Sequence, residues 1–330
     1  MRAIVCETLG TPDTLVVHTD WPEPEPKPGE IKVRLLARAV QYVDVLMVAG
    51  QYQTKPPVPF IPGGEAAGEV VALGEGVTGF AVGDMVMSRH TPCGAFADYG
   101  VSPADQTMHI PKGMSVEAAA GFRSAYATAY HALVQRGRLQ AGETLLIHGA
   151  AGGIGLAAVQ VGKALGATVI GAASTEEKRA VVLANGADHV IDYEPVTDGR
   201  GTFREKVKEL TGGKGADVVY DPVGDWVFEE SMRCINWGAR ILILGFLGGS
   251  PALARTNHLL IKGASAVGVR LGGFVDNEPD VAAANLRALV DLAEKGLLKP
   301  HVSHTLPLER ASEALQLLVD RRVIGKAVLV

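Results

Sequence analysis

The spacing of apolar positions changes part-way along the chain. Up to about Val101, short runs alternate between apolar and polar residues and turn residues separate them, as in IKVRL, GEVVALGEGV and FADYGVS. Such alternation is typical of strands with one buried face. From Thr144 the runs are continuously apolar and helical segments lie between them: TLLIH, ATVIGA, DHVID, DVVYD, RILILG and SAVGV. Strands of this second kind are buried on both faces, which predicts the parallel sheet of an α/β domain.

The C-terminal tail follows neither pattern clearly. Its periodicity predicts two amphipathic helices, around 281–294 and 308–318, and a last apolar run, KAVLV. The whole chain has 330 residues, of which 47% are hydrophobic. That length corresponds to about two domains, with ample apolar material for their cores.

Charge and cysteine content exclude several classes of function. The 31 basic and 36 acidic residues are mixed along the chain and give a formal charge of -5, which predicts no nucleic-acid partner. Since no apolar stretch reaches the roughly 20 residues that span a bilayer, we also expect no membrane partner. The three cysteines are odd in number and far apart, so they suggest neither a disulfide framework nor a cysteine zinc cluster. We therefore expect a cytoplasmic protein.

The stretch HGAAGGIGL, residues 148–156, directly follows an apolar run and begins a helix pattern. A helix N-terminus offers unpaired N–H groups and a positive dipole end, which suit a phosphate. Gly152 would let a pyrophosphate approach the backbone, and Gly155 would let the helix pack closely, with Gly153 and Ile154 completing the turn. Ala150 stands where the usual motif has its first glycine. The strand–turn–helix–strand context favours a dinucleotide site over a simple packing turn.

The end of the second buried strand bears on the choice of cofactor. An NAD site normally has Asp or Glu about 20 residues beyond the glycines, whereas this chain reads GAASTEEK there. Ser174 lies at the strand end, and Lys178 follows one turn into the next helix, where it could meet a 2′-phosphate. This favours NADPH over NADH. Alternatively, Ser174 and Glu177 form a capping box and Lys178 lies on a solvated face.

Longer segments carry a family likeness. HGAAGGIGLAAVQVGKALGA, NGADHVIDY, ADVVYDPVG and QYVDVLMVAGQYQTKPPVPFIPGGEAAGEV together resemble the zinc-independent quinone oxidoreductase branch of the medium-chain dehydrogenase/reductase superfamily. The resemblance runs nearly end to end. It implies a β-rich GroES-like barrel domain, residues 1–123 and 267–330, around an inserted Rossmann domain, residues 124–266, with the cofactor in the cleft between them. It also implies a homodimer that continues the Rossmann sheet across the edge strand near 266–269.

The resemblance also concerns zinc. Zinc-dependent members of the superfamily have a cysteine shortly before an Asp and a His immediately before a Glu. This chain has Gln41 ahead of Asp44, and Gly64 before Glu65. We therefore expect no zinc, and without a Lewis acid the easier chemistry is hydride transfer to an acceptor that is already electrophilic, such as a quinone or an activated alkene.

Further site residues are implied by the resemblance. Gln41 matches a nicotinamide-facing amide, usually Asn in relatives, and Tyr52 matches a tyrosine of the substrate cleft that could donate to the developing quinol oxygen. The expected cofactor contacts are Thr128, Gly245 and Phe246, together with Tyr193 and Arg321, which would surround the 2′-phosphate with Lys178. Each has a structural alternative: Tyr52 filling a barrel edge, Thr128 inside a helix, Tyr193 as a strand-end aromatic, Arg321 as a surface cation and 245–246 as a packing turn. His131 and His148 are interpreted as structural, since no nucleophile motif accompanies them.

Three functions remain open. The leading hypothesis is an NADPH-dependent quinone reductase. The first alternative is a reductase of 2-enoyl thioesters or small enones. The second is an NADPH-binding protein with little turnover, crystallin-like or RNA-associated, although the net negative charge disfavours RNA.

Overall fold

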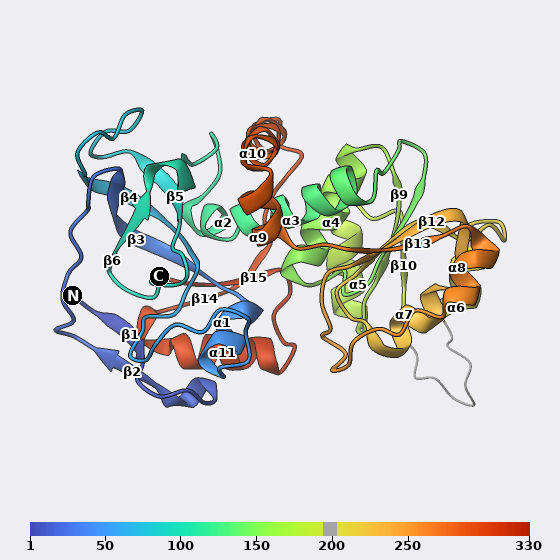
Figure 1. Cartoon of the computed structure of the whole chain (residues 1–330), viewed down its shortest axis with the longest axis horizontal. Helices are drawn as coiled ribbons and strands as arrows, with labels where there is room; N and C mark the ends of the chain where they lie inside the picture. Colours follow the sequence, from blue (N-terminus) through green and yellow to red (C-terminus); the bar gives the residue numbers. More distant parts are fainter. Residues whose placement is uncertain (194–202) are drawn as a thin grey trace. The chain divides into compact units, whose positions relative to one another are not determined.

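The computed structural model describes residues 1–193 and 203–330 (Figure 1). The chain forms two compact units. Unit 1 comprises Met1–Ser124 and Lys299–Val330, and unit 2 comprises Ala125–Leu298. The chain thus leaves unit 1 once and returns to it, as expected for one domain inserted into another.

Unit 2 is built on a parallel sheet. Over the described residues it has six strands in the order β10-β9-β8-β11-β12-β13. Figure 1 shows α4 and α5 on one face of this sheet and α6, α7 and α8 on the other. The strand bounds are β8 Thr144–Ile147, β9 Thr168–Ala172, β10 His189–Ile191, β11 Ala216–Asp221, β12 Ile235–Ile243 and β13 Ser265–Gly268. This is the doubly wound order of a Rossmann fold, and the predicted α/β domain is confirmed.

The residue pattern explains these elements. Three residues of β8 are fully buried: Leu145, Leu146 and Ile147. The strand lies between β9 and β11 in the sheet, and helices cover both faces of the sheet. The helices of unit 2 are α4 Gly153–Ala164, α5 Glu176–Ala184, α6 Phe203–Leu210, α7 Asp225–Ser231, α8 Thr256–Lys262, α9 Leu271–Asn277 and α10 Pro279–Glu294, with α3 Arg123–Tyr130 at the unit's start.

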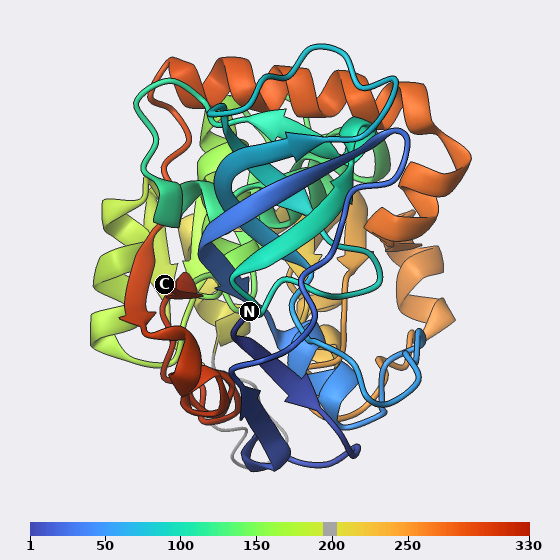
Figure 2. The same ribbon diagram turned by 90° about the vertical axis from the view of Figure 1, so that its left-hand side faces the viewer.

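Unit 1 is β-rich, as the alternating pattern predicted. Its larger sheet has the order β14-β15-β3-β4-β5-β7 in the described chain, with β6 added beside β3. Figure 2 faces this unit, which contains both the dark blue N-terminal hairpin and the red C-terminal segment. The bounds are β1 Ala3–Cys6, β2 Leu15–His18, β3 Glu30–Val40, β4 Glu65–Leu73, β5 Met85–Arg89, β6 Tyr99–Pro103, β7 Thr107–His109, β14 Val302–Leu306 and β15 Lys326–Leu329, with α1 Tyr42–Val48, α2 Val116–Ala120 and α11 Ala311–Val319.

Residues 267–298 belong to a different unit from the one that the sequence predicted. The sequence assigned them to the GroES-like domain, but they lie within unit 2. β13 pairs in parallel with β12, and Asn285 of α10 exchanges side-chain hydrogen bonds of 3.0 and 3.1 Å with Gln135. An amphipathic pattern shows that one helix face is buried but does not identify the partner, so the boundary was placed too early.

Over residues 1–193 and 203–330, no helix combines the length and apolarity that a membrane span requires.

Candidate functional site

The glycine turn lies at the carboxyl edge of β8. Gly149 has a φ of +57°, which L side chains rarely adopt, so the tight turn uses this glycine rather than position 150. Ala150 N–H donates to the carbonyl of Ala172 at 3.0 Å and ties the turn to β9. A Cβ on Gly155 would lie 2.2 Å from the Gly149 carbonyl oxygen, whereas one on Gly152 would lie 3.3 Å from that oxygen. Gly155 is therefore needed for the fold, and Gly152 keeps the helix entrance free of side chains.

A series of hydrogen bonds between side chains and backbone groups inside unit 2 supports this turn. Gly149 N–H donates to the Tyr193 hydroxyl at 2.7 Å, and that hydroxyl lies 3.0 Å from His148 Nδ1. On the other side of the ring, His148 Nε2 lies 2.7 Å from Ser231 Oγ, whose proton goes to the Val227 carbonyl at 2.7 Å. These partners assign the proton of His148 to Nε2 and direct the Tyr193 proton to Nδ1.

His148 therefore acts as a structural residue. Its side chain is fully buried, and burial lowers its pKa to about 3, so the ring stays neutral at neutral pH. Burial also raises the pKa of Tyr193 above its usual range. Because the hydroxyl already serves Gly149 and His148, Tyr193 holds the turn, and a contact of this phenol with a 2′-phosphate stays a prediction.

The loops after β11 and β12 lie beside the glycine turn at the same sheet edge. Leu244 N–H donates to the Asp221 carbonyl at 2.9 Å, and Leu247 N–H donates to the Pro222 carbonyl at 3.1 Å. The predicted cofactor residues Gly245 and Phe246 lie between these two bonds, and Phe246 is half exposed. The order of the strands reverses between β8 and β11, which is where doubly wound sheets bind their ligands.

Asp221 is a residue of this edge that the sequence reasoning missed. It is buried, and its Oδ1 accepts from the backbone N–H groups of Val223 at 2.8 Å and Gly224 at 2.9 Å. Its second oxygen has no partner among the described residues, and burial raises its pKa. An acidic residue at a parallel strand's carboxyl end, followed by Pro and Gly, was the available signal.

The start of α5 differs from the predicted capping box. The N-cap is Thr175, whose Oγ1 accepts from Lys178 N–H at 3.2 Å, while Ser174 is exposed and precedes the cap. The alternative cap by Ser174 and Glu177 was thus wrong by one residue, because either hydroxyl satisfies the sequence rule and only the backbone decides. Arg179 donates to the Ala173 carbonyl at 3.1 Å and pairs with Asp192 at 2.7 Å. The strand β9 ends at Ala172 and carries no Asp or Glu at its carboxyl end.

In unit 1, Gln41 is the N-cap of α1 and lies against a buried carboxylate. Its backbone N–H donates to Asp44 Oδ2 at 2.8 Å, and its side-chain Nε2 donates to Glu65 Oε2 at 2.7 Å. The other oxygen of Glu65 accepts from the backbone N–H of Ser124, in the first turn of α3, at 2.6 Å. Asp44 and Glu65 are only 1% and 2% exposed, so both are held by hydrogen bonds inside the protein.

The electrostatics of this cluster follow from burial. Burial raises the pKa of Asp44 to about 7, against the opposing hydrogen bond from Gln41, and nearby Glu65 raises it further. Burial lowers the pKa of Lys326, whereas Glu65 and Asp44 act to raise it. Burial likewise raises the pKa of the Cys93 thiol to about 12. The sequence reasoning named Asp44 and Glu65 only as neighbours of missing zinc ligands and missed Lys326.

The donors at this position do not suit zinc. Gly64 has no side chain, the Gln41 amide nitrogen is engaged by Glu65, and Cys93 is a partly buried thiol with a raised pKa. In the described part of the chain, no group of three or more His, Cys, Asp or Glu side chains could hold a metal ion. Zinc prefers thiolate and imidazole ligands, which this cluster does not supply.

The remaining predicted residues are divided between the units. Tyr52 is partly buried against the core of unit 1, and its hydroxyl has no hydrogen-bond partner within residues 1–193 and 203–330. Arg321 belongs to unit 1 and follows α11 with a φ of +57°. Thr128 lies on α3 in unit 2, as do Lys178 and the glycine turn.

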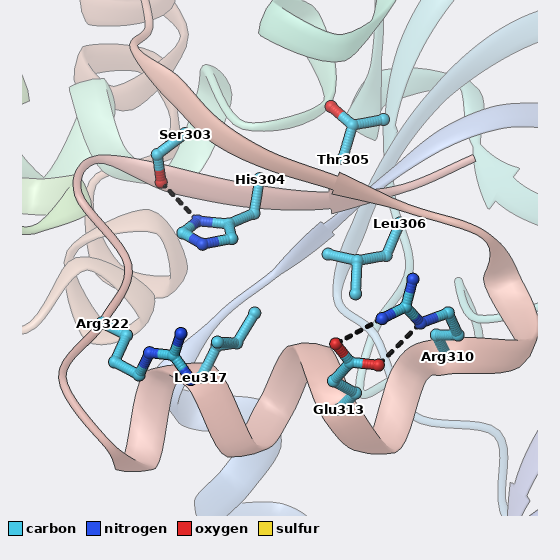
Figure 3. Close-up of a pocket in the computed structure, with 8 residues that line it drawn as sticks. All are labelled: Ser303, His304, Thr305, Leu306, Arg310, Glu313, Leu317 and Arg322. Carbon is cyan, nitrogen blue, oxygen red and sulfur yellow. Dashed lines mark hydrogen bonds and ion pairs between the residues drawn. The ribbon is translucent and has the colours of Figure 1, made fainter.

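A shallow hollow of about 350 Å³ lies between β14 and α11 in unit 1 (Figure 3). Arg310 and Glu313, paired at 2.5 Å, stand at one end, and Arg322 stands at the other. None of the predicted site residues lines it, and its walls are largely exposed side chains. We therefore do not assign the hollow to the candidate site.

Comparisons with known proteins agree with this architecture. Residues 27–112 match the model of the alcohol dehydrogenase GroES-like domain, and residues 153–289 match that of the zinc-binding dehydrogenases. A quinone oxidoreductase-like protein 2 homolog of Nematostella vectensis is 36% identical over 330 residues, which cover 99% of this chain and 88% of the relative. The chain belongs to the quinone oxidoreductase family of medium-chain dehydrogenases/reductases.

Two solved structures of this oxidoreductase family extend the comparison. The Escherichia coli quinone oxidoreductase complexed with NADPH is 30% identical, has a TM-score of 0.89 and aligns over 100% of both chains. A 2-haloacrylate reductase is 32% identical, has a TM-score of 0.83 and aligns over 100% of this chain and 99% of its own. The fold predicted from the resemblance, a GroES-like domain with a Rossmann-type domain, is confirmed.

Proposed function

We propose that this protein uses NADPH to reduce quinones. The observation that carries the proposal is the carboxyl edge of the unit 2 sheet. There a glycine turn leads into α4, and β9 carries no Asp or Glu at its carboxyl end. Beyond β9, Lys178 lies in the first turn of α5. A free helix entrance suits a pyrophosphate, and a cation beyond β9 suits a 2′-phosphate. The NADPH complex of the Escherichia coli relative supports the choice of cofactor.

The chain's own residues would bind and orient the reactants. When bound, NADPH supplies the hydride. Gln41 offers an amide to the nicotinamide, and the Tyr52 hydroxyl, which has no partner in the described chain, donates to the quinone oxygen as negative charge develops there. Because the Gln41–Gly64 position lacks zinc ligands, no step depends on a Lewis acid, which favours acceptors that are already electrophilic.

Activated alkenes are the second candidate substrates. The 2-haloacrylate reductase is as similar in sequence as the quinone oxidoreductase, so the shared scaffold does not by itself separate the two chemistries. Both acceptors take a hydride at an electron-poor carbon or oxygen without prior polarisation by a metal.

An acceptor panel tests the proposal. NADPH oxidation should be followed with quinones, small enones, 2-haloacrylate and 2-enoyl thioesters, and the values of kcat/KM compared. We expect quinones to give the highest value and Tyr52→Phe to lower kcat by about tenfold or more, since one transition-state hydrogen bond is lost. Higher kcat/KM with the alkenes would transfer the proposal to them. Tight NADPH binding without oxidation by any acceptor would identify a binding protein instead.

We also propose a homodimer formed at the outer edge of the unit 2 sheet. In the described sheet β13 is an edge strand, and Leu260 and Ile261 of the adjacent α8 are 81% and 68% exposed. An unpaired strand edge is a template for pairing with another chain, and clustered exposed apolar side chains mark interaction sites.

A further inference from the structure

Asp221 ends β11, and its side chain is bonded to the turn that follows it. The side chain is only 1% exposed, and its Oδ1 accepts from the backbone N–H groups of Val223 at 2.8 Å and Gly224 at 2.9 Å. Such bonds from an Asp to the backbone two and three residues on stabilise a tight turn. Gly224 has a φ of +70°, which L side chains rarely adopt. The Asp221 carboxylate therefore holds an unusual backbone conformation at the carboxyl end of β11.

The turn after β11 in its own right holds the loop after β12. The carbonyl of residue 222 accepts from the N–H of residue 247 at 3.1 Å, and that of residue 223 accepts from the N–H of residue 248 at 2.8 Å. A Cβ on Gly224 would lie 3.1 Å from Cδ1 of Phe246, so the two segments are also closely packed. Because the direction of these carbonyls depends on the conformation of the turn, the Asp221 carboxylate places both segments.

Both segments belong to one half of the unit 2 sheet. Its order is β10-β9-β8-β11-β12-β13, in which two three-stranded halves meet between β8 and β11. In a doubly wound sheet of this order each half binds one mononucleotide of a dinucleotide, at the carboxyl ends of its strands. The glycine turn and Lys178 belong to the half formed by β8, β9 and β10. Since the 2′-phosphate of NADPH is part of its adenosine, we expect the nicotinamide mononucleotide at the other half.

We propose that Asp221 is a positioning residue for the nicotinamide mononucleotide of NADPH, because it holds the turn after β11 and, through that turn, the loop after β12. The proposal rests on the proposed function only for the cofactor and for the side on which its 2′-phosphate lies, and it does not depend on which acceptor is reduced. One oxygen is enough for this role, because Oδ2 of Asp221 has no hydrogen-bond partner in the described residues.

Two substitutions separate the acceptor oxygen from the shape of the side chain. Asp221→Leu keeps the branched shape and removes the acceptor, whereas Asp221→Asn keeps one oxygen for the two N–H groups. The Kd of NADPH should be compared with that of adenosine 2′,5′-bisphosphate, which lacks the nicotinamide mononucleotide. We expect Asp221→Leu to weaken NADPH by about tenfold and the bisphosphate by less than about twofold. Asp221→Asn should bind NADPH within about threefold of the wild type.

Asp217, at the amino end of the same strand, supplies the matched control. Its Oδ2 accepts from the backbone N–H of Thr144 at 2.8 Å, and its Oδ1 accepts from Asn236 Nδ2 at 2.7 Å. Asp217→Leu therefore also removes a carboxylate that binds the backbone, but at the edge of the sheet opposite to the glycine turn. We expect it to lower the thermal unfolding midpoint and to leave both Kd values within about twofold of the wild type.

Several results would overturn the positioning role. They are equal losses for the two nucleotides in Asp221→Leu, no loss at all, a loss in Asp221→Asn as large as in Asp221→Leu, and a selective loss of NADPH in Asp217→Leu. If the leucine variant of Asp221 does not fold, Asp221→Ala, which adds no bulk, takes its place in the same comparison. Since the decisive readouts are binding constants, absence of quinone reduction would refute the proposed function without affecting this result.

Discussion

At the scale of single residues, Lys178 and Arg321 carry the predicted preference for NADPH. Lys178 lies in the first turn of α5, and Arg321 follows α11. A charge-assisted hydrogen bond to a phosphate contributes on the order of 1.5 to 3 kcal/mol. We expect Lys178→Ala to weaken NADPH by roughly 10 to 150-fold and to leave NADH nearly unchanged, with a similar result for Arg321→Ala.

The measurement is the Kd of both nucleotides at one ionic strength. Two solvated surface charges would instead give changes below about threefold for both nucleotides, because exposed charges are screened. Equal losses for NADPH and NADH would place the 2′-phosphate elsewhere.

At the scale of elements, two glycines of the turn between β8 and α4 have different roles: Gly155 is needed for folding, and Gly152 is expected to matter for nucleotide binding. A methyl group on Gly155 would lie 2.2 Å from the Gly149 carbonyl oxygen, so Gly155→Ala should lower the free energy of unfolding by about 1 to 3 kcal/mol. Gly152 has an ordinary φ of -78°, so Gly152→Ala should fold normally. Its methyl group would obstruct the pyrophosphate, and NADPH and NADH should both weaken by about tenfold or more. Urea unfolding and the two Kd values check this pair, and unchanged binding in Gly152→Ala would contradict the assigned site.

The predicted dimer contact lies at the sheet edge formed by β13 and the neighbouring helix α8. We expect a dimeric mass by light scattering at micromolar concentration, and a monomeric mass for Leu260→Glu, because a buried charge opposes the association. Val82 of unit 1 is 66% exposed, and Val82→Glu serves as the matched control that should stay dimeric. A monomeric wild type would refute the dimer.

At the scale of the whole molecule, buried groups of both units set the dependence of stability on pH. Burial lowers the pKa of His90 to about 4 and of His148 to about 3, so below about 6.5 the unfolded chain binds two protons that the folded chain does not. Asp44 acts oppositely: its folded pKa of about 7 exceeds the unfolded value of about 3.9, so the folded chain binds one more proton between them. Counting these three groups, the unfolded chain binds one proton more than the folded chain. The free energy of unfolding therefore rises by about 1.4 kcal/mol per pH unit between about pH 4.5 and pH 6.

Asp44→Asn should steepen this dependence. Without Asp44 the difference becomes two protons, or about 2.7 kcal/mol per pH unit, so acid should destabilise the variant faster than the wild type. Asp44 is faced by Glu65, Lys326 and Cys93, which remain in both proteins, so the difference between the two slopes reports Asp44. Urea unfolding at pH 4.5, 5.5 and 6.5 gives both slopes, and parallel slopes would show that Asp44 is ionised in the folded chain throughout.

The sequence by itself determined the elements and their class. Continuous apolar runs predicted β8 to β13, because a strand buried on both faces has no polar side. Gly152 and Gly155 predicted the strand–turn–helix motif for a similarly local reason, since the backbone at a turn limits the side chains beside it. A tail helix around 281–294 was also predicted, and α10 spans Pro279–Glu294, although its packing partner was not predicted.

Only the tertiary structure decided which side chains meet. Gln41 and Glu65 are 24 residues apart, and Tyr193 lies 45 residues from His148, so neither contact follows from a local pattern. The Tyr193 phenol, expected at a phosphate, supports the glycine turn, and Glu65, known only as the residue after a missing ligand, accepts a hydrogen bond from the Gln41 amide. Backbone periodicity reports burial along one element, whereas the partner of a buried polar group depends on how distant elements pack together.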